Sequence, residues 1–213
     1  MKKKIIVFAM ILGVISCKKD INNKVELSEA KEVIQVSKSE AVLVDAEYSK
    51  VIWRGFKPGG EHYGLINISE GTLNIKDGNL IGGAFKFDMN SIIDIDMPED
   101  SEYNVKLVDH LKSSDFFDVV KYPMVTFEIT EVNDVGGDLN ISGNLTIKGT
   151  TKNISFSVAM VTNDGIVILK SEVFTIDRTD FDVRYGSNKF FDNLKDKFIN
   201  DEFELSFEVK TVQ

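Results

Sequence analysis

Alternation of apolar and polar residues is the feature that most constrains the fold of this 213-residue chain. In residues 139–147, Leu139, Ile141, Leu145 and Ile147 share one side of an extended backbone, and polar residues alternate with them. A period of two residues is typical of a β-strand with one buried face. The same pattern recurs in residues 85–89, 125–129, 154–160 and 203–209. The chain is therefore predicted to be all-β, with one apolar face throughout.

Short turn sequences separate these predicted strands. Pairs such as Gly136-Gly137 and Asp164-Gly165 tolerate positive φ, and such short links join neighbouring antiparallel strands. The apolar parity also shifts by one residue around Glu70-Gly71, which predicts one long strand bent by a glycine bulge. About eight strands is the number at which a closed barrel either fills with its own side chains or holds one small ligand. A single antiparallel barrel of about eight strands is therefore predicted.

Two segments depart from the alternation. Residues 103–120 and 188–197 carry apolar side chains at helical spacing and are predicted to be short helical excursions between strands. Two roles are open for these segments. They either lid or plug one end of the barrel, or they cap its core.

The N-terminus has the pattern of an export signal. Three lysines precede an unbroken apolar run from residue 5 to residue 15, which is shorter than the roughly 20 apolar residues of a membrane-spanning helix. Small Ser16 then precedes Cys17, the only cysteine of the chain, and residues 14–17 resemble the lipobox of bacterial lipoproteins. We therefore predict a signal peptide over residues 1–16 and lipid attachment at Cys17.

The polar segment that follows is predicted to be a spacer. Residues 17–46 are expected to form the lipidated N-terminus and linker, and residues 47–213 the barrel domain. Thirty extended residues span roughly 100 Å, enough to hold a domain well away from a membrane. We expect the protein in the cell envelope, lipid-anchored to a membrane on the side that faces the periplasm or the cell exterior.

The charge of the chain excludes nucleic acid as a partner. Lys and Arg number 25 against 34 Asp and Glu, which gives a formal net charge of −9. Cleavage after Ser16 would remove three lysines and no acidic side chain, so the net charge would become −12. Affinity for nucleic acid depends largely on neutralisation of phosphates by Lys and Arg, and an excess of acidic residues opposes it.

A series of motifs in the second half of the chain carries a family resemblance. The chain resembles the YceI-like family of polyisoprenoid-binding, lipocalin-like proteins from about residue 47 to residue 213. The matching motifs occur in family order: Asp109-His110-Leu111-Lys112-Ser113-Ser114-Asp115-Phe116-Phe117-Asp118, Tyr122-Pro123, Thr126-Phe127, residues 143–152, residues 176–181 and residues 201–205.

The resemblance implies both a fold and a class of ligand. It implies a lipocalin-like, up-and-down barrel with an internal tunnel for an isoprenoid chain, sometimes as a quinone. No resident cofactor is predicted. The family's usual Ser-His pair in the first strand is missing here. Instead the chain carries a Trp-x-Gly-x-Lys-Pro sequence from Trp53 to Pro58, which resembles a lipoprotein subgroup of the family. The partners expected are an apolar lipid and, through the anchor, a membrane; a homodimer is left open.

The sequence contains few of the motifs and residue types that catalysis needs. The sequence has no GxSxG, HExxH, CxxC or phosphate-binding glycine loop, and it contains only two histidines. The acidic run from Asp94 to Asp100 lacks the glycine and spacing of an EF-hand. Neither a catalytic residue nor a metal site is predicted, and an envelope hydrolase is the weakest of three function classes considered.

The apolar face supplies the candidate binding residues. If the barrel is hollow, the ligand is expected to contact Trp53, Phe85, Phe87, Met89, Phe127, Ile129, Leu145, Ile147, Phe156, Phe174 and Phe207. His110 and Arg178 are the candidates for headgroup contact, although the preferred interpretation is that His110 pins a loop and that Arg178 forms ion pairs with neighbouring aspartates. The alternative is a solid barrel that these same side chains fill, acting as a structural or protein-interaction module without a lipid ligand.

Overall fold

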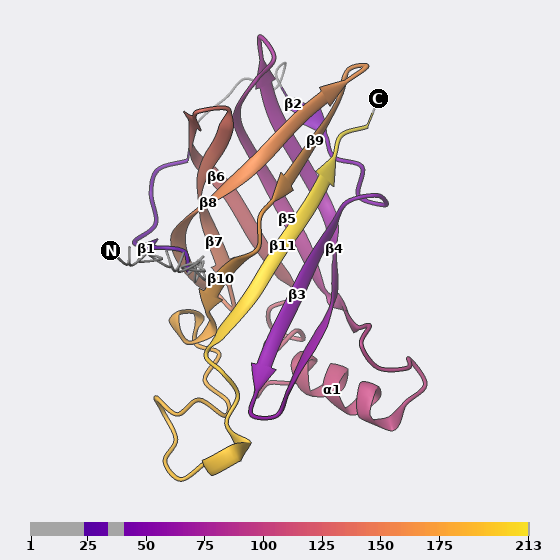
Figure 1. The fold of residues 1–213 in the computed structure, drawn as a ribbon, viewed down its shortest axis with the longest axis vertical. Coiled ribbons are helices and arrows are strands. Elements are labelled where there is room, and N and C mark those ends of the chain that lie inside the picture. Colours follow the sequence, from indigo (N-terminus) through magenta and orange to yellow (C-terminus); the bar gives the residue numbers. More distant parts are fainter. Residues whose placement is uncertain (1–23, 34–40, 213) are drawn as a thin grey trace, which may run out of the picture.

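The computed structural model describes residues 24–33 and 41–212, which form a closed antiparallel β-barrel of eight strands with smaller strands at its edges (Figure 1). Around the barrel, each strand pairs with the next in the order β3-β4-β5-β6-β7-β8-β9-β11, and β11 closes the ring on β3. These strands are β3 (Lys50–Lys57), β4 (Gly60–Lys76), β5 (Asn79–Asp94), β6 (Met124–Val135), β7 (Asp138–Ile147), β8 (Thr150–Asn163), β9 (Ile166–Ser171) and β11 (Glu202–Lys210). The predicted all-β barrel is confirmed.

The alternation in the sequence maps onto the inside and outside of this barrel. In β7, Ile141, Leu145 and Ile147 are buried in the core. The predicted bulge is also present, because the β4–β5 register shifts between the pairs at Ile68 and Glu70. One continuous 17-residue strand thus bends around the barrel without a break.

Gly143 occupies the apolar face of β7 because a side chain does not fit there. A Cβ at this position would lie 2.3 Å from Cζ of Phe127 and 2.9 Å from the backbone oxygen of Glu128. Since one of these atoms belongs to the backbone, rotation of the Phe127 ring alone cannot relieve the clash.

We therefore expect Gly143→Ala to lower the free energy of unfolding by about 1–3 kcal/mol, the usual cost of overpacking a core. Chemical denaturation monitored by circular dichroism measures this change in the free energy of unfolding. Gly60→Ala is the matched control, because its Cβ would meet only Cε of Lys57, at 3.8 Å. Equal effects of the two substitutions would contradict this account of Gly143.

The segment predicted to be a spacer contributes to the wall of the barrel. β1 (Leu27–Ser28) pairs with β8, and Lys24 forms a parallel bridge with Thr175 of β10 (Phe174–Asp177). β2 (Ala41–Leu43) pairs with β4. The expected domain boundary at residue 47 therefore lies inside the folded unit. The predicted signal peptide and Cys17 lie outside the described residues.

The physical reason for this difference is an open edge of the sheet. β9 pairs with β8, but after Ser171 the chain continues as β10, which pairs with β11 and not with β8. Residues 24–28 occupy the space between β8 and β10, and the backbone N–H of Val25 donates to the carbonyl of Thr175 at 3.0 Å. Val25 is buried, so this short stretch completes both the hydrogen bonding and the core.

The first helical excursion is confirmed, and the second is mostly turns. α1 (Glu102–Lys112) begins at Ser101, whose side chain accepts a hydrogen bond from the backbone N–H of Tyr103. In residues 188–197, the structure has only the three-residue η3 (Lys195–Lys197). Asn193 and Lys195 have φ of 61° and 53°, which an α-helix excludes. A second short helix, η2 (Arg178–Phe181), directly follows β10.

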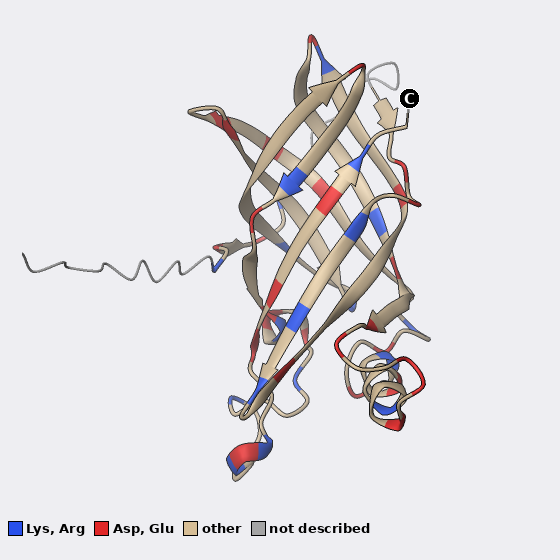
Figure 2. Cartoon of the chain, turned by 45° about the vertical axis from the view of Figure 1, so that its right-hand side comes forward, with Lys and Arg blue, Asp and Glu red and all other residues tan. Residues whose placement is uncertain are grey.

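Both excursions lie at the same end of the barrel, the lower end in Figure 1. Figure 2 shows charged residues of both signs spread over strands, loops and helices in that view, without a separate basic face. Among the described residues, no helix combines the length and the apolar character needed to cross a membrane.

Candidate functional site: an apolar cavity at one end of the barrel

The lower half of the barrel encloses a cavity of about 440 Å³. Its walls come from the inward faces of β3 to β8, β10 and β11, together with α1 and the loop that precedes β11. The lining includes the exposed side chains Lys57, Tyr185 and Lys197, so the cavity reaches the surface at this end. Its volume falls within the range of roughly 300–1,000 Å³ that is usual for small-molecule sites.

Most of the predicted ligand contacts line this cavity. Nine of the eleven apolar candidates do so, namely Trp53, Phe87, Met89, Phe127, Leu145, Ile147, Phe156, Phe174 and Phe207. The two exceptions are Phe85 and Ile129, which lie deeper and border a separate space of only about 30 Å³. The barrel is therefore hollow at one end and packed at the other.

A layer of four phenylalanines separates the hollow end from the packed end. Phe87, Phe127, Phe156 and Phe207 border both spaces, and we call them the phenylalanine layer. The ring of Phe156 lies 5.5 Å from that of Phe127 and 5.6 Å from that of Phe207, between ring centroids. These contacts form a floor on which the end of a ligand chain would rest.

Arg178 lines the cavity, but its guanidinium mainly holds the covering loop. Its side chain is 3% exposed. Its Nε, Nη1 and Nη2 donate to the backbone carbonyls of Asn200 at 3.0 Å, Val183 at 2.7 Å and Ile199 at 3.0 Å. Most of its donors are thus engaged within the protein, which favours a structural role over headgroup recognition.

His110 is the better-placed candidate at the mouth. It lies in the last turn of α1, and its ring meets that of Tyr185 edge-to-face, with centroids 4.4 Å apart. A second edge-to-face contact joins it to Phe116 at 5.8 Å. Both His110 and Tyr185 line the cavity, so imidazole and phenol groups stand beside the entrance.

Several lining residues were missed in the sequence because they lie outside the alternating strands. Leu107, Phe116 and Phe117 come from the α1 segment, and Tyr185 and Ile199 come from the loop before β11. The available signal was the apolar spacing of the two predicted excursions, which left a lid and a core cap open and did not identify the side chains that face inward.

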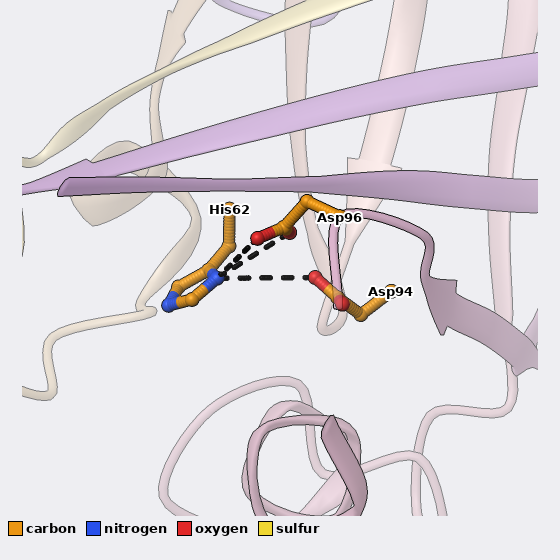
Figure 3. A group of neighbouring side chains, drawn as sticks. All are labelled: His62, Asp94 and Asp96. Carbon is orange, nitrogen blue, oxygen red and sulfur yellow. Dashed lines mark hydrogen bonds and ion pairs between the residues drawn. The ribbon is translucent and has the colours of Figure 1, made fainter. Parts of the chain in front are cut away.

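The structure also brings together three polar side chains at the edge of the cavity (Figure 3). His62 of β4 faces Asp94, the last residue of β5, and Asp96 in the loop that follows. Nδ1 of His62 lies 3.1 Å from Oδ2 of Asp96 and 3.9 Å from Oδ2 of Asp94. Burial, and after it the neighbouring Asp96 carboxylate, raise the pKa of Asp94 to about 6.

The closed eight-stranded barrel and its apolar cavity define the class of this protein as a lipocalin-like β-barrel. Residues 43–211 match the YceI-like domain, and the chain belongs to this family. It is 30% identical over 100 residues to protein YceI of Escherichia coli O17:K52:H18 (strain UMN026 / ExPEC), an alignment that covers 46% of this chain and 49% of that protein. It is 32% identical over 100 residues to a UPF0312 protein of Pseudomonas aeruginosa (strain LESB58), with the same coverage. The chain thus spans about half the length of these curated relatives.

This chain also matches solved structures over nearly the whole length of those structures. BcnA of Burkholderia cenocepacia superposes with a TM-score of 0.65 at 22% identity, over 79% of this chain and 99% of that one. A polyisoprenoid binding domain from Saccharophagus degradans, implicated in plant cell wall breakdown, superposes with a TM-score of 0.61 at 13% identity, over 81% of this chain and 97% of that one. At these identities the likeness establishes the fold.

Proposed function

We propose that this protein binds the hydrocarbon chain of an isoprenoid or similar lipid in the cavity, without catalysing a reaction on it. The observation that supports the proposal is the cavity of about 440 Å³, which reaches the surface at the end where Tyr185 lines it. Apolar side chains line its depth, and the polar and charged groups of the lining are few. The resemblance to a polyisoprenoid binding domain points to the same class of ligand.

The chemistry of such a site predicts how affinity depends on the ligand. Burial of a five-carbon isoprene unit contributes at most about 4 kcal/mol by the per-methylene figure. Ligands as large as a lipid chain gain a binding free energy closer to about 0.3 kcal/mol per atom, or about 1.5 kcal/mol per isoprene unit. Affinity should therefore rise with chain length until the tail reaches the phenylalanine layer, and headgroup identity should matter less.

Extraction of the purified protein under denaturing conditions, followed by mass spectrometry, tests the proposal. We expect a co-purifying isoprenoid or similar amphiphile, and a rise in melting temperature when a polyprenol is added to delipidated protein. If no lipid co-purifies and added polyprenol does not raise the melting temperature, the alternative is favoured, in which the barrel acts through its outer surface as a structural or interaction module.

The phenylalanine layer gives a prediction about ligand length. Phe156→Ala removes a ring between the two internal spaces, so we expect the longest chain that raises the melting temperature to increase by at least one isoprene unit. The substitution should also cost about 3–5 kcal/mol of stability, as large-to-small core changes do. A homologous series of prenols, assayed by thermal shift, measures the length limit.

Phe174→Ala is the matched control. Phe174 stacks on Phe156 with centroids 4.5 Å apart, but it borders only the cavity. Its removal should widen the site while leaving the preferred chain length unchanged. An unchanged length limit in Phe156→Ala would show that the layer does not form the floor of the site.

We further propose that the protein works in the cell envelope, anchored by lipid on Cys17. The support is the basic, apolar and small-residue pattern of residues 1–17. Two acyl chains anchor a protein stably where a single one does not. Metabolic labelling with a clickable fatty acid should label the wild-type protein and leave Cys17→Ser unlabelled; equal labelling of both would refute the anchor.

A further inference from the structure

The cluster of His62, Asp94 and Asp96 has the composition of a metal site. One imidazole from β4 and two carboxylates from the end of β5 and the loop after it come together here. Each residue offers one ligand atom, and these three atoms all lie within 4.8 Å of one another. Side chains of these types are common ligands of divalent cations.

Asp94 supplies the independent observation. Its side chain has no exposed surface, and its Oδ2 is buried without a hydrogen-bond partner among the described residues. Its Oδ1, by contrast, accepts from the backbone N–H of Met97 at 3.1 Å and from Nδ2 of Asn104 at 3.3 Å. A buried carboxylate oxygen without a partner is costly, so it indicates an absent cation or proton.

The surroundings hold the three groups in place. The carboxylate of Asp96 accepts from the backbone N–H of Tyr63 at 3.0 Å. Nδ2 of Asn104, from α1, also donates to the backbone oxygens of Asp94 and Met97, at 3.3 and 3.0 Å. Hydrogen bonds of this kind orient carboxylate ligands around metals. The two carboxylates are therefore held by β4, the end of β5 and α1 before any ion binds.

The distances fit a small ion. Nitrogen and oxygen ligands at about 2.1 Å in tetrahedral geometry lie about 3.4 Å from one another. Nδ1 of His62 is 3.1 Å from Oδ2 of Asp96 and 3.9 Å from Oδ2 of Asp94, which brackets that value. The two carboxylate ligand atoms lie within 4.8 Å of each other, so side-chain rotations that shorten this distance would bring all three atoms to one ion.

We propose that His62, Asp94 and Asp96 form a site for one divalent transition-metal ion, with Zn²⁺ as its best probe. Imidazole suits zinc well, whereas Ca²⁺ takes six to eight oxygen ligands and Mg²⁺ prefers an octahedral oxygen shell. The ion would join the β3–β4 hairpin to the loop before α1. His62 also lines the cavity, so the metal would fix one side of the lipid-binding site.

Isothermal titration of the full chain with Zn²⁺ in detergent, after treatment with EDTA, tests this site. We expect one equivalent to bind, and we expect Asp94→Asn and His62→Gln each to weaken binding by at least about tenfold. Loss of even an outer-shell partner of a metal costs about 10–100-fold in affinity. Ca²⁺ and Mg²⁺ should bind far more weakly than Zn²⁺.

Two control variants exclude other zinc ligands. His110→Gln removes the only other histidine, and Cys17→Ser removes the only thiol. Both should keep the site at full affinity. The side chain of His62 is 22% exposed, so we expect His62→Gln to fold. A melting temperature in EDTA equal to that of the wild type would show it. Absence of stoichiometric Zn²⁺ binding, or binding that survives in folded His62→Gln, would overturn the proposal.

Discussion

Replacing Leu145 with glutamate is expected to abolish uptake of an apolar ligand. Leu145 is 5% exposed and lines the cavity, so a carboxylate there either stays ionised and hydrated or is buried at a large free-energy cost. A loss of about 1.4 kcal/mol lowers affinity tenfold, and an unpaired charge against a hydrocarbon tail costs several times that. The shift in melting temperature on addition of a polyprenol should disappear.

Two further variants separate loss of the site from loss of the fold. Leu145→Phe adds volume without charge, so it should reduce ligand uptake in a protein that remains folded. Val135→Glu places the same carboxylate on a side chain that is 65% exposed, and it should leave uptake unchanged. A wild-type melting shift in Leu145→Glu would mean that the ligand binds elsewhere.

Arg178→Ala is expected to produce a large loss of stability, comparable to that of a large-to-small change in the core. The substitution leaves the carbonyls of Val183, Ile199 and Asn200 without their donor. It also removes the ion pair with Asp201, whose Oδ1 lies 3.5 Å from Nη2. An unsatisfied buried group costs about 1–3 kcal/mol, and loss of one partner of a buried ion pair about 3–5 kcal/mol. Because these terms overlap, we expect a total of about 4 kcal/mol by chemical denaturation.

Arg178→Ala should also weaken binding of the ligand. Residues 185–200, which Arg178 fastens to the barrel, contribute Tyr185, Lys197 and Ile199 to the cavity, so ligand affinity should fall as well. Arg178→Lys should not rescue the protein, because one ammonium cannot reproduce the planar fork of donors.

Arg184→Ala is the control for these effects. Arg184 lies in the same loop, its side chain is 56% exposed, and it pairs with Asp182 at the surface. Its removal should cost less than about 1 kcal/mol. A comparable loss in the two alanine variants would contradict the role assigned to Arg178.

The strands of the barrel were predictable because their signal is local. Alternation over a short run of residues identifies a strand with one buried face, and the parity shift at Glu70-Gly71 located the bulge. In the stretch from Lys24 to Ser28, Val25 and Leu27 alternate with polar residues, but five residues are too few to identify a strand. Its place in the wall depends on an edge left open by β8 and β10, which lie in a distant part of the chain.

The division between cavity and packed core was not predictable from the same pattern. Phe85 and Phe87 alternate identically in β5, yet only Phe87 reaches the cavity. Which residues are covered depends on how far each strand runs past the next and on where α1 and the loop before β11 lie. The cluster around Asp94 was missed because the sequence shows the acidic run but not the histidine across from it.

The short strand at Leu27–Ser28 changes how far a membrane-anchored form of this protein would extend. Because the barrel wall already begins at Lys24, only seven residue steps separate it from Cys17, a maximal reach of about 25 Å. A lipid on that cysteine would keep the wall of the barrel at Lys24 within about 25 Å of the bilayer surface. A tail leaving the membrane would then cross little water before it entered the cavity.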